Sequence, residues 1–185
     1  MIAAAEPTRG TRRTTLAVAA AAAASALVVL TLRHYGVTAL GAAWSGAQLL
    51  LVFVAAFDVM TRRIPNRVTA PAALVVLALR AAFEHSTLPA AAAAGAIAFG
   101  AFFLFALLTR GGIGMGDVKL VGLLGLLLGK AVLPALLLGV VAGGIGSLVV
   151  LVARSGGRGH TFAYGPYLCL GAALGILAFG PPPLV

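Results

Sequence analysis

Two aspartates are the residues of this sequence whose type and placement indicate chemistry. Asp58 closes one apolar run, Asp117 opens another, and the chain contains no further aspartate. Acidic side chains at membrane depth are costly in free energy, and they mark functional sites. The sequence therefore predicts a site in which two carboxylates work as one unit.

The chemistry of such a pair follows from its shared proton. Two carboxyl groups in a low-dielectric site cannot both ionise easily, so their titrations couple. The ionised carboxylate can then draw a proton from water while the protonated one donates to the scissile carbonyl, as in aspartic proteases. This mechanism requires no metal and no cofactor, and we expect neither.

Each aspartate also has a structural interpretation. Asp117 follows a glycine-rich segment and precedes an apolar run, which is a suitable place for a helix N-cap. Asp58 could be a solvated acid at a helix end, balanced by Arg62 four positions later. Neither interpretation explains why the only two aspartates would share one face of a membrane.

The residues around the aspartates have plain structural roles as well. Ile64-Pro65 is expected to end the second helix, because a residue before proline is pushed away from helical geometry. Asn66 could then cap the third helix. Lys119 stands two positions from Asp117, so the two side chains lie on different faces of a helix. We interpret Lys119 as an orientation signal or a lipid-phosphate contact rather than a catalytic group.

The composition indicates an integral membrane protein. Of the 185 residues, 62% are hydrophobic and only 9% are charged, and the mean hydropathy is +1.11. The apolar runs approach the roughly 20 residues of a spanning helix and lack the alternation of barrel strands. The net charge of +9 is spread over the connections, which argues against a nucleic-acid site. Cys169 is the only cysteine, so neither an intrachain disulfide nor a cysteine-based zinc site is possible.

The sequence predicts an all-α, polytopic helix bundle of about seven spans. The fifth and sixth spans meet at a weakly marked turn near Gly129-Lys130 and Pro134. The first span could instead be a signal peptide, although no convincing cleavage site follows it. The seven candidate spans are residues 15–32, 40–58, 68–83, 88–108, 117–132, 131–153 and 162–179.

Basic residues predict the orientation of these spans. With the N-terminus in the cytoplasm, ten of the 13 lysines and arginines lie on the cytoplasmic side. Only Arg33, Arg80 and Lys130 then lie outside, and the C-terminus is outside too. Asp58 and Asp117 fall at cytoplasmic helix ends. The ten cytoplasmic residues are Arg9, Arg12, Arg13, Arg62, Arg63, Arg67, Arg110, Lys119, Arg154 and Arg158.

The fifth span is short for a membrane. The 13 steps from Asp117 to Lys130 cover about 20 Å of helix, whereas the hydrocarbon core is about 30 Å thick. We therefore expect the glycine-rich residues 111–116 to dip into the membrane, where protein or a water-filled cavity must satisfy their backbone.

Taken together, these residues resemble the type IV prepilin peptidases, which are GxGD intramembrane aspartic proteases. The resemblance rests on Asp58 with Ile64-Pro65-Asn66, and on Gly114-x-Gly116-Asp117-x-Lys119. Tyr164-Gly165-Pro166 resembles the aromatic-Gly-Pro stretch that opens the family's last helix. The resemblance implies a six-helix core over residues 40–180, preceded by an N-terminal tail and extra helix (1–39) and followed by a short tail (181–185).

The resemblance also implies catalysis by Asp58 and Asp117 at the cytoplasmic face of a prokaryotic inner membrane. The substrates would be prepilins or pseudopilins, and pilus-assembly or secretion machinery could be a partner. The chain lacks the cysteine-rich segment of larger members, so it is closer to the compact peptidases of Tad/Flp pilus systems, and we expect no N-methylation. Two alternatives stay open: a small proton-coupled transporter or channel, and a noncatalytic scaffold.

Overall fold

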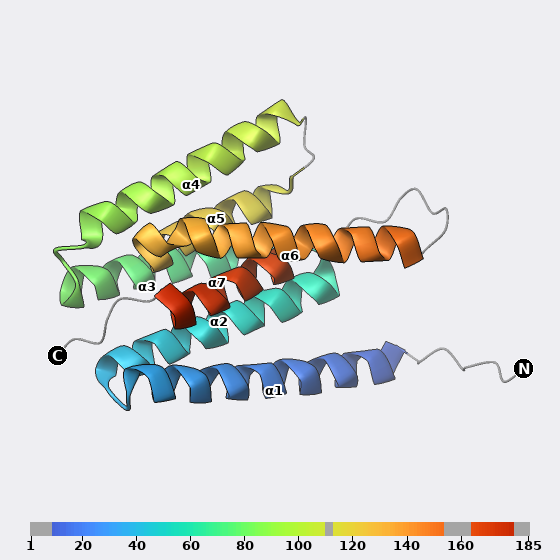
Figure 1. Cartoon of the computed structure of the whole chain (residues 1–185), viewed down its shortest axis with the longest axis horizontal. Coiled ribbons are helices and arrows are strands. Elements are labelled where there is room, and N and C mark those ends of the chain that lie inside the picture. Colours follow the sequence, from blue (N-terminus) through green and yellow to red (C-terminus); the bar gives the residue numbers. More distant parts are fainter. Residues whose placement is uncertain (1–8, 110–112, 154–163, 180–185) are drawn as a thin grey trace, which may run out of the picture.

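The protein is a bundle of α-helices (Figure 1). The computed structural model describes residues 9–109, 113–153 and 164–179, and no strand occurs within these ranges. The predicted all-α class is thus confirmed. The helices are α1 (Arg9–Tyr35), α2 (Ala39–Thr61), α3 (Asn66–Phe83), α4 (Leu88–Leu108), α5 (Met115–Leu128), the 3-10 turn η1 (Gly129–Ala131), α6 (Val132–Ala153) and α7 (Gly165–Phe179).

Four helical stretches in the described part of the chain are long and apolar enough to cross a membrane. They are Thr14–Tyr35, Ala39–Thr61, Leu88–Leu108 and Met115–Val149, the last of which runs through α5, η1 and α6. Helix α7 is apolar but shorter. Large apolar side chains face outward from the bundle, including Leu74, Ile97 and Leu108, which are 68%, 72% and 73% exposed. Such a surface suits lipid rather than water.

Successive helices run in alternating directions, so their ends gather at the two poles of the bundle (Figure 1). The C-terminal end of α2 and the N-terminal ends of α5 and α7 therefore lie at one pole. Asp58 and Asp117 belong to these ends. The topology alone brings the two aspartates to the same end of the molecule.

Helix α5 lies at the centre of the packing. Val118, Leu120, Val121 and Leu124 are completely buried, and α5 packs against α3, α4 and α7. The crossing of α4 and α5 is close, because a Cβ atom on Gly125 would lie only 2.5 Å from the Cα of Gly95. Small residues allow this approach between helices in lipid.

The end of α5 confirms the weakly marked turn. Gly129 has a positive φ of 55° and starts the 3-10 turn that leads into α6. Arg80 reaches this end from α3 and donates a hydrogen bond from Nη2 to the carbonyl oxygen of Leu127 at 2.8 Å. Its Nη1 forms a 2.8 Å salt bridge with Glu84. A cation at a helix C-terminus satisfies a free carbonyl and opposes the helix dipole.

Helix α7 is held to α1 and α2 by two polar contacts inside the apolar packing. The Tyr35 hydroxyl donates to the carbonyl oxygen of Ile176 at 2.7 Å. The Gln48 side-chain amide donates to the carbonyl oxygen of Ala173 at 3.2 Å, and Gln48 is completely buried. These bonds fix the position of α7 along its neighbours.

Candidate active site

Asp58 is buried at the end of α2. Only 4% of its surface is exposed, so the interpretation of Asp58 as a solvated acid is wrong. The helix ends one turn later at Arg62, which takes a left-handed conformation with φ 53° and donates its backbone N–H to the carbonyl oxygen of Asp58 at 2.7 Å. The chain leaves the helix while the carboxylate stays directed into the bundle.

The Asp58 carboxylate contacts the N-terminal end of α7. The backbone N–H of Gly165 donates a hydrogen bond to this carboxylate. A Cβ atom on Gly165 would lie 2.6 Å from Asp58 Oδ2, which is too close for any side chain. Glycine at the first position of α7 is therefore what allows an acid of α2 to approach this helix N-terminus, where backbone N–H groups favour an anion.

Asp117 lies in the first turn of α5, three residues after the N-cap. The structure places Gly114 at the cap, in an extended conformation without a side-chain cap bond. The expectation that Asp117 is itself the N-cap is therefore wrong. Its carboxylate turns back over the start of the helix, since a Cβ atom on Gly114 would lie 3.3 Å from Asp117 Oδ2.

The two carboxylates lie close enough for their charges to interact. Asp58 is closed in by α7, whereas Asp117 is half-buried and more accessible. A pair of this kind can share one proton and activate water, which is the chemistry expected from the sequence.

Ile64 joins the three sequence elements around the pair. A Cβ atom on Gly116 would lie 3.1 Å from Ile64 Cβ, and one on Gly165 would lie 3.3 Å from Ile64 Cδ1. The side chain is thus inserted between the first turns of α5 and α7, next to both aspartates. The Ile64 side chain leaves little room for a Cβ atom at position 116 or 165, which is why glycine suits both positions.

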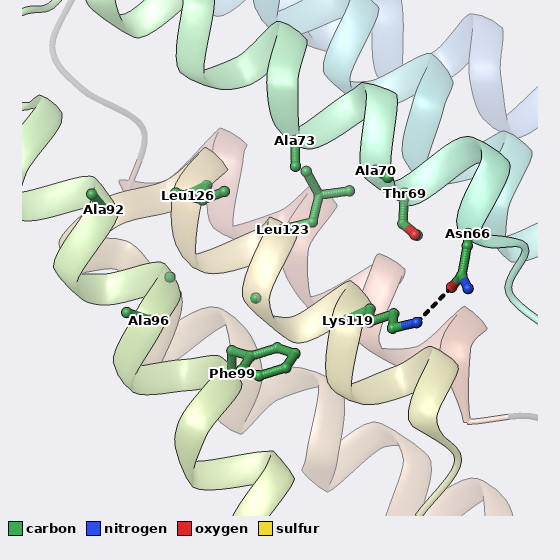
Figure 2. A pocket seen from close by; sticks show the side chains of 12 residues that line it. Asn66, Thr69, Ala70, Ala73, Ala92, Ala96, Phe99, Lys119, Leu123 and Leu126 are labelled. Carbon is green, nitrogen blue, oxygen red and sulfur yellow. Dashed lines mark hydrogen bonds between the residues drawn. The ribbon is translucent and has the colours of Figure 1, made fainter.

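Pro65 and Asn66 act differently from the expectation. Pro65 occupies the N-cap of α3 with φ −75°, so the helix break at Ile64-Pro65 is confirmed. Asn66 is the first helical residue of α3, so it is not the N-cap. The N-cap is Pro65, whose fixed φ is compatible with that position. Instead, Asn66 Oδ1 accepts a 2.9 Å hydrogen bond from Lys119 Nζ (Figure 2). Lys119 faces α3, away from the face that carries Asp117.

Tyr164 anchors the start of α7 to α6. Its hydroxyl donates to the carbonyl oxygen of Val140 at 3.3 Å. A Cβ atom on Gly143 would lie 2.7 Å from the Tyr164 ring. Pro166 follows in the first turn of α7, where its missing N–H has no intrahelical partner to lose. These contacts position Gly165 against Asp58.

Sequence reasoning missed some contributors to this end of the bundle. Gly143 accommodates the Tyr164 ring, a contact between α6 and the start of α7 that no local pattern indicates. Thr69, a buried polar residue of α3, was not singled out. Cys169 is a free cysteine buried in the apolar core. Arg110, Arg154 and Arg158, which the charge pattern places on the cytoplasmic side, and Gly111 and Gly112 of the glycine-rich segment lie outside the described residues.

Comparison with known proteins adds an independent observation. The model of the type IV leader peptidase family matches residues 45–148. Two prepilin leader peptidase/N-methyltransferases, from Burkholderia pseudomallei strains 1026b and K96243, are each 35% identical to this chain over 167 residues, which is 85% of the chain and 52% of each relative. The chain therefore spans about half the length of these curated relatives. No solved structure matches it.

Proposed function

Because the chain belongs to the type IV leader peptidase family, we propose that it is an intramembrane aspartic endopeptidase that removes the leader from type IV prepilin-like or pseudopilin precursors. One observation carries this proposal. Ile64 packs against both Gly116 of α5 and Gly165 of α7, and this packing brings Asp58 and Asp117 close enough for their charges to interact.

In the proposed reaction, the two aspartates divide the work of peptide hydrolysis. One carboxylate takes a proton from a water molecule, and the water oxygen attacks the scissile carbonyl carbon. The other carboxyl group donates its proton to the carbonyl oxygen. Collapse of the tetrahedral intermediate transfers a proton to the leaving amine and returns the pair to its starting state. The Gly165 N–H holds the Asp58 carboxylate in place throughout.

The test is leader removal from a co-expressed prepilin of the same genome. Asp58→Asn and Asp117→Asn should each lower cleavage by about 10²- to 10⁴-fold, which is the usual contribution of a positioned general acid or base. Glu84→Gln is the matched control, because Glu84 is an acid at the opposite pole. Wild-type cleavage by both asparagine variants, with the proteins present in the membrane, would refute the proposal.

We also propose seven spans with the aspartate pole in the cytoplasm. Helix α1 begins and α7 ends at opposite poles, which supports an odd number of crossings, and α1 begins at the aspartate pole (Figure 1). Arg62, Arg63 and Arg67 lie near Asp58, as positive charge on the cytoplasmic side requires. Reporter fusions after Phe83 and after Thr109 test this. Activity of a periplasm-dependent reporter at Thr109, rather than at Phe83, would contradict the orientation.

The extra helix and the lack of methylation complete the proposal. The family match covers residues 45–148, from α2 into α6, and leaves α1 outside, which supports treating α1 as an addition to the proposed core over residues 40–180. Cys169, the only cysteine, is buried in α7 and leaves no cysteine cluster. We therefore expect cleavage without N-methylation, as in compact Tad/Flp peptidases. Mass spectrometry of the mature pilin N-terminus tests this, and a methyl group added by this chain alone would contradict it.

A further inference from the structure

A groove on the side of the bundle is unused by the proposed chemistry. Helices α3 and α4 diverge over α5 and leave an open groove of about 570 Å³ between them (Figure 2). Its walls are formed mainly by alanines, including Ala73 of α3 and Ala92 and Ala96 of α4. Leu123 and Leu126 of α5 form an apolar floor. The groove is lined mainly by apolar residues and opens on the side of the bundle, which faces lipid in the proposed membrane orientation.

One end of the groove is polar. Lys119 Nζ lies there, held at 2.9 Å by Asn66 Oδ1. Thr69 also lines this end and is only 5% exposed. Its hydroxyl has no hydrogen-bond partner among the described residues, and Figure 2 shows the hydroxyl oxygen directed into the groove. The oxygen is open to the groove, so it can form a hydrogen bond with a ligand that enters there.

The charge at the polar end is positive. The N-terminus of α3 begins here, and its cap residue Pro65 makes no side-chain cap bond. The N–H groups of Asn66 and Arg67 at the start of this 18-residue helix have no capping side chain, whereas those of Val68 and Thr69 donate to the carbonyl oxygen of Pro65. Together with the Lys119 ammonium, the N–H groups of Asn66 and Arg67 favour an anion. A basic peptide would meet like charges at this position.

We propose that this groove binds an anionic phospholipid of the surrounding membrane. The phosphate lies at the polar end, where it accepts hydrogen bonds from Lys119, Thr69 and the first turn of α3. An acyl chain lies along the alanine walls over Leu123 and Leu126. The site is separate from the aspartate pair, because Lys119 and Asp117 occupy different faces of α5. The proposal does not depend on peptidase activity.

Lipid binding to the purified full-length chain in detergent tests this proposal. Native mass spectrometry would compare dioleoylphosphatidylglycerol with dioleoylphosphatidylcholine. Lys119→Gln should weaken phosphatidylglycerol binding by about tenfold or more, as loss of a charged hydrogen bond predicts. Lys130→Gln, which removes a lysine at the opposite pole, should leave it unchanged. Equal binding by wild type and Lys119→Gln would overturn the proposal.

The apolar part of the groove needs its own variants. Ala96→Leu fills the groove and should reduce binding of both lipids, whereas Ala93→Leu, one position outside the lining of the same helix, should not. Thr69→Val keeps the side-chain shape and removes only the hydroxyl, so it tests the polar end even if Ala96→Leu fails to fold. A photo-crosslinking residue at Ala92 in cells should capture lipid. Capture of a precursor protein there would show a substrate-helix site and overturn the proposal.

Discussion

The contact between Gly165 and Asp58 allows a quantitative prediction. In Gly165→Ala, the new methyl group would lie 2.6 Å from Asp58 Oδ2, whereas an ordinary van der Waals contact begins at 3.4 Å. The two groups must therefore separate by about 0.8 Å. The methyl group cannot easily move toward Ile64, because Ile64 Cδ1 lies only 3.3 Å from the same methyl position. The Asp58 carboxylate or the start of α7 has to move.

The size of the effect follows from this displacement. A misplacement of about 1 Å in a catalytic group can lower a rate by about 10²-fold, which corresponds to about 2.7 kcal/mol of transition-state stabilisation. We expect Gly165→Ala to lower kcat/KM for leader cleavage by about that factor. Stability should change less, because alanine has the higher helix propensity.

The assay is leader cleavage in membrane vesicles, with the folded fraction measured by thermal unfolding. Gly144→Ala in α6 is the matched control, since a Cβ atom there has no neighbour within 4 Å. Gly144→Ala should cleave like the wild type. The reasoning is refuted if Gly165→Ala also retains wild-type cleavage while Asp58→Asn is inactive, because the contact would then not position the carboxylate.

Three further perturbations test other contacts. Ile64→Ala should lower cleavage more than stability, because it empties the space between the first turns of α5 and α7; a normal rate would show that the insertion is not needed. Gly171→Leu should lower the free energy of unfolding by several kcal/mol, because the new side chain overlaps α6. Gly144→Leu should not destabilise the fold, since a Cβ atom at Gly144 has no neighbour within 4 Å. Equal melting temperatures for the two variants would exclude tight packing at Gly171. Arg80→Ala should cost about 1.5–3 kcal/mol by removing the charged hydrogen bond to Leu127, and Arg80→Lys should cost less; an unchanged melting temperature would contradict this cap.

Local patterns in the sequence were enough to predict the helices. The ends of the predicted spans lie within six residues of the helix ends, and Ile64-Pro65 and Gly129-Lys130 fall at helix boundaries. Loop charges and helix alternation also predicted that Asp58 and Asp117 share one pole. These features depend on residues that are neighbours in the chain, so periodicity and turn chemistry reveal them.

Contacts between distant residues could not be predicted in the same way. Asp58 is buried because Gly165, more than a hundred positions later, closes over it. The cap positions were assigned one to three residues too late, since Pro65 and Gly114 take extended dihedrals that the side-chain preferences of Asn66 and Asp117 do not reveal. The groove depends on the divergence of α3 and α4, which no local pattern encodes.

The two hydrogen bonds between α2 and α7 restrict insertions and deletions in the segments that they join. Gln48 bonds to Ala173, and Asp58 bonds to Gly165. One residue inserted between Gln48 and Asp58 would rotate Asp58 by about 100° relative to Gln48, so both contacts could not persist. Homologous sequences should therefore differ by substitution within residues 48–58 and 165–173, and alignment gaps should fall outside these two stretches.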